Sequence, residues 1–112
     1  MNFLRRLFFN LWYHMIIQCQ QVAKQYASNR VLDGIGLEIP EGEFFGLVGM
    51  NGSGKSTLIK AILDLTGFVE GDIKIQCISH RNVRSRENIA YLPDRFSPPA
   101  HLRGQDFIQY ML

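Results

Sequence analysis

The sequence has little of what several protein classes require. Only two cysteines occur in 112 residues, Cys19 and Cys77, and they form no C-x-x-C pair. This spacing indicates neither a disulfide framework nor a metal site, and it fits a reducing compartment. The formal net charge is only +2, so the composition does not favour nucleic acid as a partner.

Long apolar runs are also missing. The run from Leu7 to Ile17 is interrupted by Asn10 and His14, whereas a membrane-spanning helix needs about 20 apolar residues. No small-residue cleavage site follows, so a signal peptide is not indicated either. Residues 1–14 are therefore either an amphipathic leader at a membrane surface or a misassigned upstream extension. The second interpretation is preferred because the globular pattern begins immediately after Met15.

What the sequence does contain is GMNGSGKST at residues 49–57, which matches the P-loop pattern G-x-x-x-x-G-K-[ST]. Such a loop binds a triphosphate through converging backbone N–H groups, and its glycines leave that approach free of side chains. Lys55 is the predicted catalytic residue because its charge can reach the β- and γ-phosphates, and Ser56 offers its hydroxyl to Mg²⁺. The predicted nucleotide-binding residues of the loop are Gly49, Met50, Asn51, Gly52, Ser53, Gly54, Lys55, Ser56 and Thr57.

The residues on both sides of this loop supply the context that the motif needs. Phe44–Val48 is a short, apolar, aromatic-rich run that predicts a buried strand. Lys55–Leu65 contains no Gly or Pro and predicts a helix that stops at Thr66-Gly67. A strand, a glycine-rich loop and a helix in this order predict an α/β fold of the P-loop NTPase class.

The remaining segments predict an antiparallel β part that leads into the P-loop strand and helix. Apolar or alternating runs predict strands at Ile16–Val22, Val31–Ile39, Asp72–Gln76 and Ile89–Leu92. Ser79–Asn88 is polar and arginine-rich, which indicates a surface loop, and the prolines near Phe96 exclude regular structure there. A helix is predicted from Gln105 to Leu112.

This order of features resembles the start of the ATP-binding subunit of ABC transporters, over Met15 to Leu112. Tyr26, followed by NRVLDGIGLEIPEGEFFGLVGMNGSGKST, looks like the family's aromatic A-loop residue, its strands and its Walker A motif. The resemblance implies that Tyr26 stacks on adenine, for which a flat π face is suited. It also implies that residues 15–112 are the N-terminal part of a nucleotide-binding domain. A tyrosine at the end of an ordinary strand is the alternative.

Asp94 lies where the family has the glutamine of its Q-loop, after Ile89-Ala90-Tyr91-Leu92-Pro93. A carboxylate can bind Mg²⁺ through water, since hard cations accept oxygen ligands, but when ionised it cannot donate a hydrogen bond. An acidic residue in this YLPE-like context is reminiscent of export-type members of the family. The alternative is an ordinary turn residue after proline.

Three motifs of the family are absent from the 112 residues: the LSGGQ-like signature, the Walker B strand that ends in Asp-Glu, and the switch histidine. A length of 112 residues also supplies fewer strands than a complete P-loop ATPase normally needs. Leu102–Gln105 echoes the signature only superficially, and His80 and His101 are expected to be surface histidines. We therefore expect an incomplete ABC ATPase domain that, alone, binds nucleotide weakly or not at all and does not turn over.

The resemblance implies ATP binding and hydrolysis coupled to membrane transport, with ATP and Mg²⁺ as cofactors. It implies a transmembrane permease subunit and a second nucleotide-binding domain as partners, and a peripheral location at the cytoplasmic face of the membrane. Two alternatives stay open: a different P-loop NTPase, such as a small-molecule kinase or a GTPase, and a non-catalytic nucleotide-binding or membrane-associated remnant.

Overall fold

The structure is a computed structural model that describes residues 14–112. The leader or upstream extension expected at residues 1–14 lies outside the described residues, apart from His14. The carbonyl of His14 accepts a hydrogen bond from the Glu41 N–H at 2.7 Å. Among the helices of residues 14–112, none is both long enough and apolar enough to cross a membrane.

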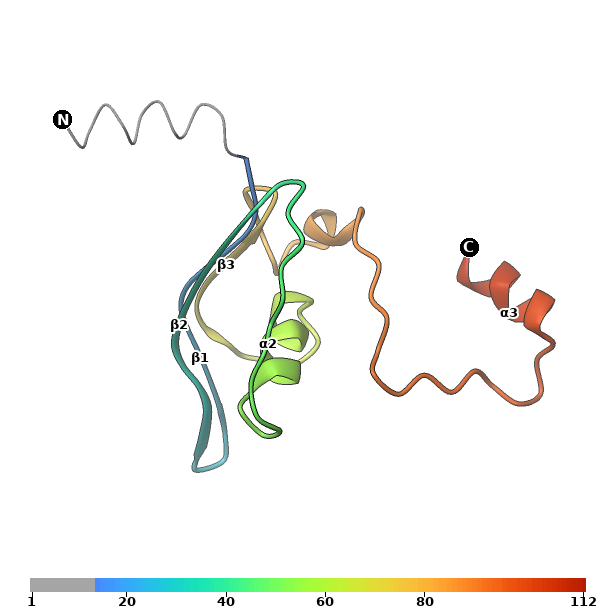
Figure 1. The fold of residues 1–112 in the computed structure, drawn as a ribbon, viewed down its shortest axis with the longest axis horizontal. Coiled ribbons are helices and arrows are strands. Elements are labelled where there is room, and N and C mark those ends of the chain that lie inside the picture. Colours follow the sequence, from blue (N-terminus) through green and yellow to red (C-terminus); the bar gives the residue numbers. More distant parts are fainter. Residues whose placement is uncertain (1–13) are drawn as a thin grey trace.

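The described residues form one antiparallel sheet with a helix on one face (Figure 1). The sheet has four strands in the order β2-β1-β3-β4. In chain order the elements are β1 (Met15–Tyr26), β2 (Asn29–Pro40), α2 (Lys55–Ile62), β3 (Glu70–Ile75), β4 (Ile78–Ser79), the 3₁₀ helix η1 (Val83–Arg86) and α3 (Gly104–Met111).

The β1–β2 hairpin is the longest part of the sheet. Each strand has 12 residues, and the pairing runs from Met15 opposite Pro40 to Tyr26 opposite Asn29. Both strands predicted from the sequence are confirmed, although each extends further than its apolar run. The extension includes polar residues because the ladder of backbone hydrogen bonds continues up to a turn of two residues, at which Ala27 has φ 53°.

A β-bulge shapes the contact between β1 and β3. Gln21 has φ 52°, and the pairing register shifts between Gln20 and Ala23. Opposite the bulge, Gly71 has φ 87°, and a Cβ atom at this position would lie 2.4 Å from the carbonyl oxygen of Gln21. Glycine is therefore required at position 71 both by its backbone conformation and by the close approach of β1.

The hydrophobic core lies between α2 and the sheet. Leu58, Ala61 and Ile62 of α2 are buried against residues from three strands and the loop before β3. Fully burying one large apolar side chain contributes roughly 1.5–3 kcal/mol. The core residues outside α2 are Cys19, Val22, Leu32, Val69, Ile73 and Ile75.

Helix α2 ends earlier than the sequence predicts, at Ile62 instead of Leu65. Asp64 has φ 57°, its N–H donates to the Ala61 carbonyl at 3.1 Å, and the Leu65 N–H donates to the Lys60 carbonyl at 2.9 Å. These two bonds are those of a Schellman motif, in which a left-handed residue closes the helix. Thr66-Gly67 lies beyond this stop.

The strand predicted at Phe44–Val48 is wrong. These residues carry no regular structure, and Phe44 and Val48 are fully exposed. A strand needs a neighbour that accepts and donates its backbone hydrogen bonds, and within residues 14–112 no strand lies beside this segment. An apolar run predicts burial in a sheet only if a partner strand is present.

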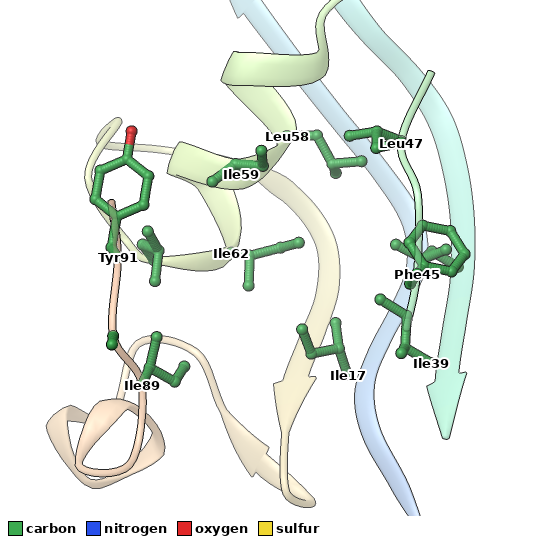
Figure 2. A pocket seen from close by; sticks show the side chains of 12 residues that line it. Ile17, Ile39, Phe45, Leu47, Leu58, Ile59, Ile62, Ile89 and Tyr91 are labelled. Carbon is green, nitrogen blue, oxygen red and sulfur yellow. The ribbon is translucent and has the colours of Figure 1, made fainter. Parts of the chain in front are cut away.

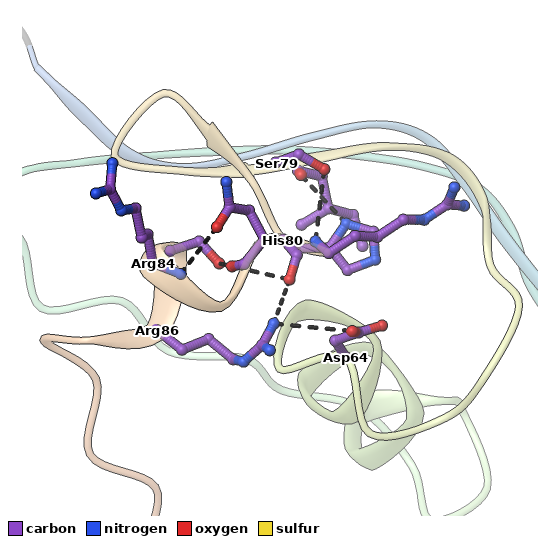
Figure 3. Close-up of polar contacts among 9 residues, drawn as sticks. Asp64, Ser79, His80, Arg84 and Arg86 are labelled. Atoms are coloured by element: carbon purple, nitrogen blue, oxygen red, sulfur yellow. Dashed lines mark hydrogen bonds and ion pairs between the residues drawn. The ribbon is translucent and has the colours of Figure 1, made fainter.

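Three further predictions are corrected around η1. Ile89–Leu92 is not a strand. Ser79–Asn88 is mostly exposed, as predicted, but it is not a plain loop, because it contains the end of β4 and the whole of η1. His80, expected at the surface, is only 4% exposed. The cause is a local network of polar contacts that holds the segment against the sheet and α2 (Figure 3).

Arg86 connects this network to the end of α2. Its Nη1 atom donates to the His80 carbonyl and lies 3.8 Å from Oδ2 of Asp64 (Figure 3). Ser85 Oγ donates to the Asn82 carbonyl at 2.7 Å, and the His80 N–H donates to the Ile73 carbonyl at 2.9 Å. The arginine-rich segment is therefore tied to its neighbours mainly through backbone carbonyls.

A chain without regular structure then leads away from the sheet to α3 (Figure 1). The helix predicted from Gln105 is confirmed as Gly104–Met111, and the proline-containing segment before it is irregular, as predicted. None of the residues of α3 is buried. Its contact with the preceding segment is made by Phe107, whose ring centroid lies 5.4 Å from that of Phe96.

An apolar groove of about 250 Å³ opens beside the core (Figure 2). Ile59 and Ile62 of α2 line one part of it, Phe45 and Leu47 of the irregular segment line another, and Ile89 faces them. The two segments wrongly predicted as strands therefore both lie along this groove. Some of their side chains line the groove, although their backbones form no ladder.

Candidate phosphate-binding site

The loop at Gly49–Thr57 folds around its own lysine. The Nζ atom of Lys55 donates to the Gly49 carbonyl, to the Met50 carbonyl at 2.7 Å and to Oγ of Ser53 at 3.3 Å. The Ser53 N–H closes the turn by donating to the Met50 carbonyl at 3.1 Å. The ammonium group of Lys55 is thus held inside the loop by acceptors from the first half of the loop, Gly49 and Met50, and from the second half, Ser53.

Glycine is required at two positions of this loop for steric reasons. Gly54, the residue before α2, has φ 96°, and a Cβ atom there would lie 3.0 Å from the Val31 carbonyl oxygen and from Leu32 Cδ2. At Gly49 a Cβ atom would lie 2.7 Å from Oγ of Ser53. The requirement is strict at Gly54, where the neighbour is the backbone of β2 and φ is positive, and weaker at Gly49, where the Ser53 hydroxyl can rotate away.

The start of α2 has the features of an anion-binding terminus. Gly54 provides no side chain to cap it, and no acidic residue lies in the first turn. The first N–H groups of a helix have no partner within the helix, and the helix dipole makes this end positive. A cavity of about 340 Å³ opens here, lined by Val31, Asn51, Gly52, Gly54, Lys55, Ser56 and Thr57.

Tyr26 lies at the end of β1, outside the lining of this cavity. Its side chain is 46% exposed, and the Nζ atom of Lys24 lies 5.1 Å from the centre of its ring. Lys24 is only 8% exposed, and it donates to the carbonyls of Thr66 and Phe68, each at 2.6 Å.

Asp94 and His101 lie outside the cavity, in the irregular chain before α3. Both are exposed, and the prediction that His101 is a surface residue is confirmed. Within residues 14–112 there is no group of three or more His, Cys, Asp or Glu side chains that could hold a metal ion. A role for Asp94 at a metal therefore stays a prediction.

The two cysteines have different surroundings in the structure. Cys19 is buried, Cys77 is exposed, and both are free thiols. Burial of Cys19 disfavours its thiolate and raises the pKa of the thiol to about 11.

The loop leads into the N-terminus of α2 with Lys55 on its inner side, but the strand that the P-loop pattern also expects before the loop is not formed by residues 44–48. A family model described as "ABC transporter" matches residues 32–107, which is more than half of the chain. The chain therefore belongs to the ABC transporter ATP-binding family, as the resemblance predicted.

Curated relatives agree with this assignment. The chain is 42% identical over 81 residues to the manganese transport system ATP-binding protein MntB of Bacillus subtilis, which covers 72% of this chain and 32% of the relative. It is 30% identical over 96 residues to a putative ABC transporter ATP-binding protein of Mycoplasma pneumoniae, covering 83% of the chain and 29% of the relative. The methionine import ATP-binding protein MetN of Clostridium tetani is 38% identical over 74 residues, with 66% and 22% covered. The chain spans about a third of the length of these relatives, or less.

Sequence reasoning located the loop but missed two residues around it. Val31 lines the cavity and contributes the carbonyl that restricts Gly54. The Nζ atom of Lys24 lies over one face of the Tyr26 ring. The sequence hints at this contact only through the spacing of the two residues, since residues two apart on a strand point to the same face. The three-dimensional neighbours of Lys24, at Thr66 and Phe68, could not be read from the sequence.

Proposed function

We propose that this chain is the N-terminal part, at residues 15–112, of the nucleotide-binding domain of an ABC transporter, and that residues 49–57 bind the phosphates of ATP. The observation that carries the proposal is the Lys55 ammonium, held between Gly49 and Ser53 at the N-terminus of α2. It is supported by the family, whose matched region includes the whole loop.

The loop residues would act together on an anion. Backbone N–H groups of residues 49–57 and the dipole of α2 attract negative charge. Lys55 would exchange its hydrogen bonds to the Gly49 and Met50 carbonyls for bonds to the β- and γ-phosphates, because charge-assisted bonds to phosphate are stronger than those to neutral carbonyls. Tyr26 would contact the base.

The residues that line the cavity could hold Mg²⁺ with few protein ligands, as is usual at nucleotide sites. Mg²⁺ prefers one or two protein oxygens together with phosphate oxygens and water, and the exposed Ser56 lines the cavity beside Lys55. Ser56 would hold the ion, and Asp94 would contribute through water. The ion would neutralise phosphate charge.

We propose that ATP hydrolysis and transport are activities of a longer protein of which this chain is a part. Attack by water needs an oriented base and a partner that stabilises the developing charge, and this chain alone is expected to supply neither. We propose that a second nucleotide-binding domain and a transmembrane permease complete the system at the cytoplasmic face of the membrane. This chain alone would not turn over ATP.

Equilibrium dialysis with labelled ATP and Mg²⁺ tests the phosphate site. Lys55→Ala is expected to weaken ATP binding by about tenfold or more, since charged hydrogen bonds are worth roughly 1.5–3 kcal/mol. Lys60→Ala is the matched control, because Lys60 lies in the last turn of the same helix, away from the loop. The chain alone is expected to bind ATP weakly, and measurable binding that is equal for the unaltered chain and Lys55→Ala would contradict the proposed site.

A further inference from the structure

Lys24 is a buried cation that the phosphate site does not use. Its side chain extends from β1 into the loop between α2 and β3, where Nζ bonds the Thr66 and Phe68 carbonyls at 2.6 Å each. An ammonium group has three donors, so two of them are committed to backbone. The two short bonds fix the position of the charge.

The loop that holds Lys24 is itself anchored. Arg81 Nη2 donates to the Val69 carbonyl at 3.2 Å, and the guanidinium of Arg81 lies 6.0 Å from the centre of the Phe68 ring. Val69 is buried in the core. The carbonyls that receive Lys24 are thus part of the packed body of the protein, so they can hold a side chain in one place.

The ring of Tyr26 lies over this fixed ammonium, 5.1 Å from it to the ring centre. A cation at this distance from an aromatic face is attracted by the negative charge of that face. The ammonium occupies one face of the ring, and Tyr26 as a whole is 46% exposed, whereas Lys24 is 8% exposed. The face opposite the ammonium, here called the outer face, is the one left for a planar ligand.

From this geometry we propose that Lys24 is a positioning residue for the nucleotide base: it orients the ring of Tyr26 so that the outer face stacks on adenine. The proposal rests on the proposed function and extends it. Helix α2 then organises both ends of the nucleotide, because its N-terminus carries the phosphate loop and the loop after it holds Lys24. An oriented ring loses less freedom when the base binds.

Comparison of two ligands separates this role from a general effect on folding. ATP carries the base, whereas methyl triphosphate presents the phosphates without the nucleoside. Affinities for both are measured with Mg²⁺ by NMR titration of the ¹⁵N-labelled chain. Lys24→Met keeps most of the stem and removes the charge, and Lys74→Met is the matched control, since Lys74 is an exposed lysine of β3 that pairs with Asp72 at 3.5 Å.

Lys24→Met is expected to weaken ATP binding about three- to fivefold, the size of a cation–π contact, with methyl triphosphate binding unchanged. Tyr26→Leu is expected to weaken ATP binding about tenfold, as loss of base stacking does, and Lys24→Met is expected to add little in that background. Lys74→Met is expected to change neither ligand. If Lys24→Met does not fold, Lys24→Gln, which keeps an N–H donor without the charge, is expected to show the same selective loss.

Equal weakening of both ligands by Lys24→Met would overturn the proposal, because it would show a general structural role. No change in ATP binding, or no effect of Tyr26→Leu, would also overturn it while leaving the phosphate site intact. If the unaltered chain binds neither ligand better than Lys55→Ala does, the proposed function itself fails and the role of Lys24 falls with it.

Discussion

Cys19 shows how a single side chain depends on the sheet around it. It is 2% exposed, in the middle of β1, and packs in the core between the sheet and α2. A thiol is a small apolar group that suits such a place, but a thiolate is not, because burial penalises the charge. The pKa of the Cys19 thiol is therefore raised from 9.0 to about 11.

This shift predicts a loss of stability in alkali. Below pH 9 the thiol is neutral in both the folded and the unfolded chain, so the stability is complete. Between pH 9 and about 11 the unfolded chain loses the proton while the folded chain keeps it, which lowers the free energy of unfolding by about 2 kcal/mol. Urea unfolding across this range measures the effect. Cys19→Ala is expected to show a smaller decrease, and an identical decrease in both chains would contradict this explanation.

At the scale of elements, the contact between β1 and β3 depends on one glycine. Gly71 faces the β-bulge at Gln21, and its φ of 87° strains any other residue. Gly42 has a similar φ of 78°, but a Cβ atom there would meet no heavy atom within 4 Å. The two positions therefore separate the cost of backbone strain from the cost of a clash.

Gly42→Ala is expected to lower the free energy of unfolding by about 1 kcal/mol, which is the cost of strain alone. Gly71→Ala is expected to lower it by about 3 kcal/mol or more, because β3 must also move away from β1. Thermal unfolding of the two variants beside the unaltered chain measures the difference. Equal losses would show that the close approach at the bulge contributes nothing.

The elements that the sequence predicted correctly have clear local signals, and this holds even for β3, which was predicted at Asp72–Gln76 and pairs with the distant β1. β1 and β2 pair across a turn of two residues, and α2 carries its own start signal in the glycine-rich loop. Phe44–Val48 and Ile89–Leu92 have the composition of strands, yet a strand forms only beside a partner. Their true surroundings are the apolar groove, which no local pattern contains.

The candidate site also has a part that could be predicted from the sequence and a part that could not. The loop from Gly49 to Thr57 could be found because its glycines and lysine occur at fixed spacing. The anchoring of Lys24 depends on carbonyls more than 40 residues away in the sequence. Such contacts arise from the fold as a whole.

At the scale of the molecule, the described residues form one packed body and an extended arm. The body comprises the sheet and α2, and the arm leads to α3, which lies away from the sheet (Figure 1). The exposed Phe44 and Val48 and the apolar groove give the body a large uncovered apolar surface. This surface supports the proposal that residues 15–112 are part of a larger nucleotide-binding domain.

The central claim is that backbone amides around Lys55 bind the phosphates of a nucleotide. Amide ¹H–¹⁵N spectra of the labelled chain, recorded as ATP and Mg²⁺ are added, test it most directly. Saturable shifts are expected at residues 49–57 and at Tyr26, and the shifts at residues 49–57 are expected to be lost in Lys55→Ala. Shifts spread over the exposed arginines, or unchanged loop amides at saturating ATP, would contradict it.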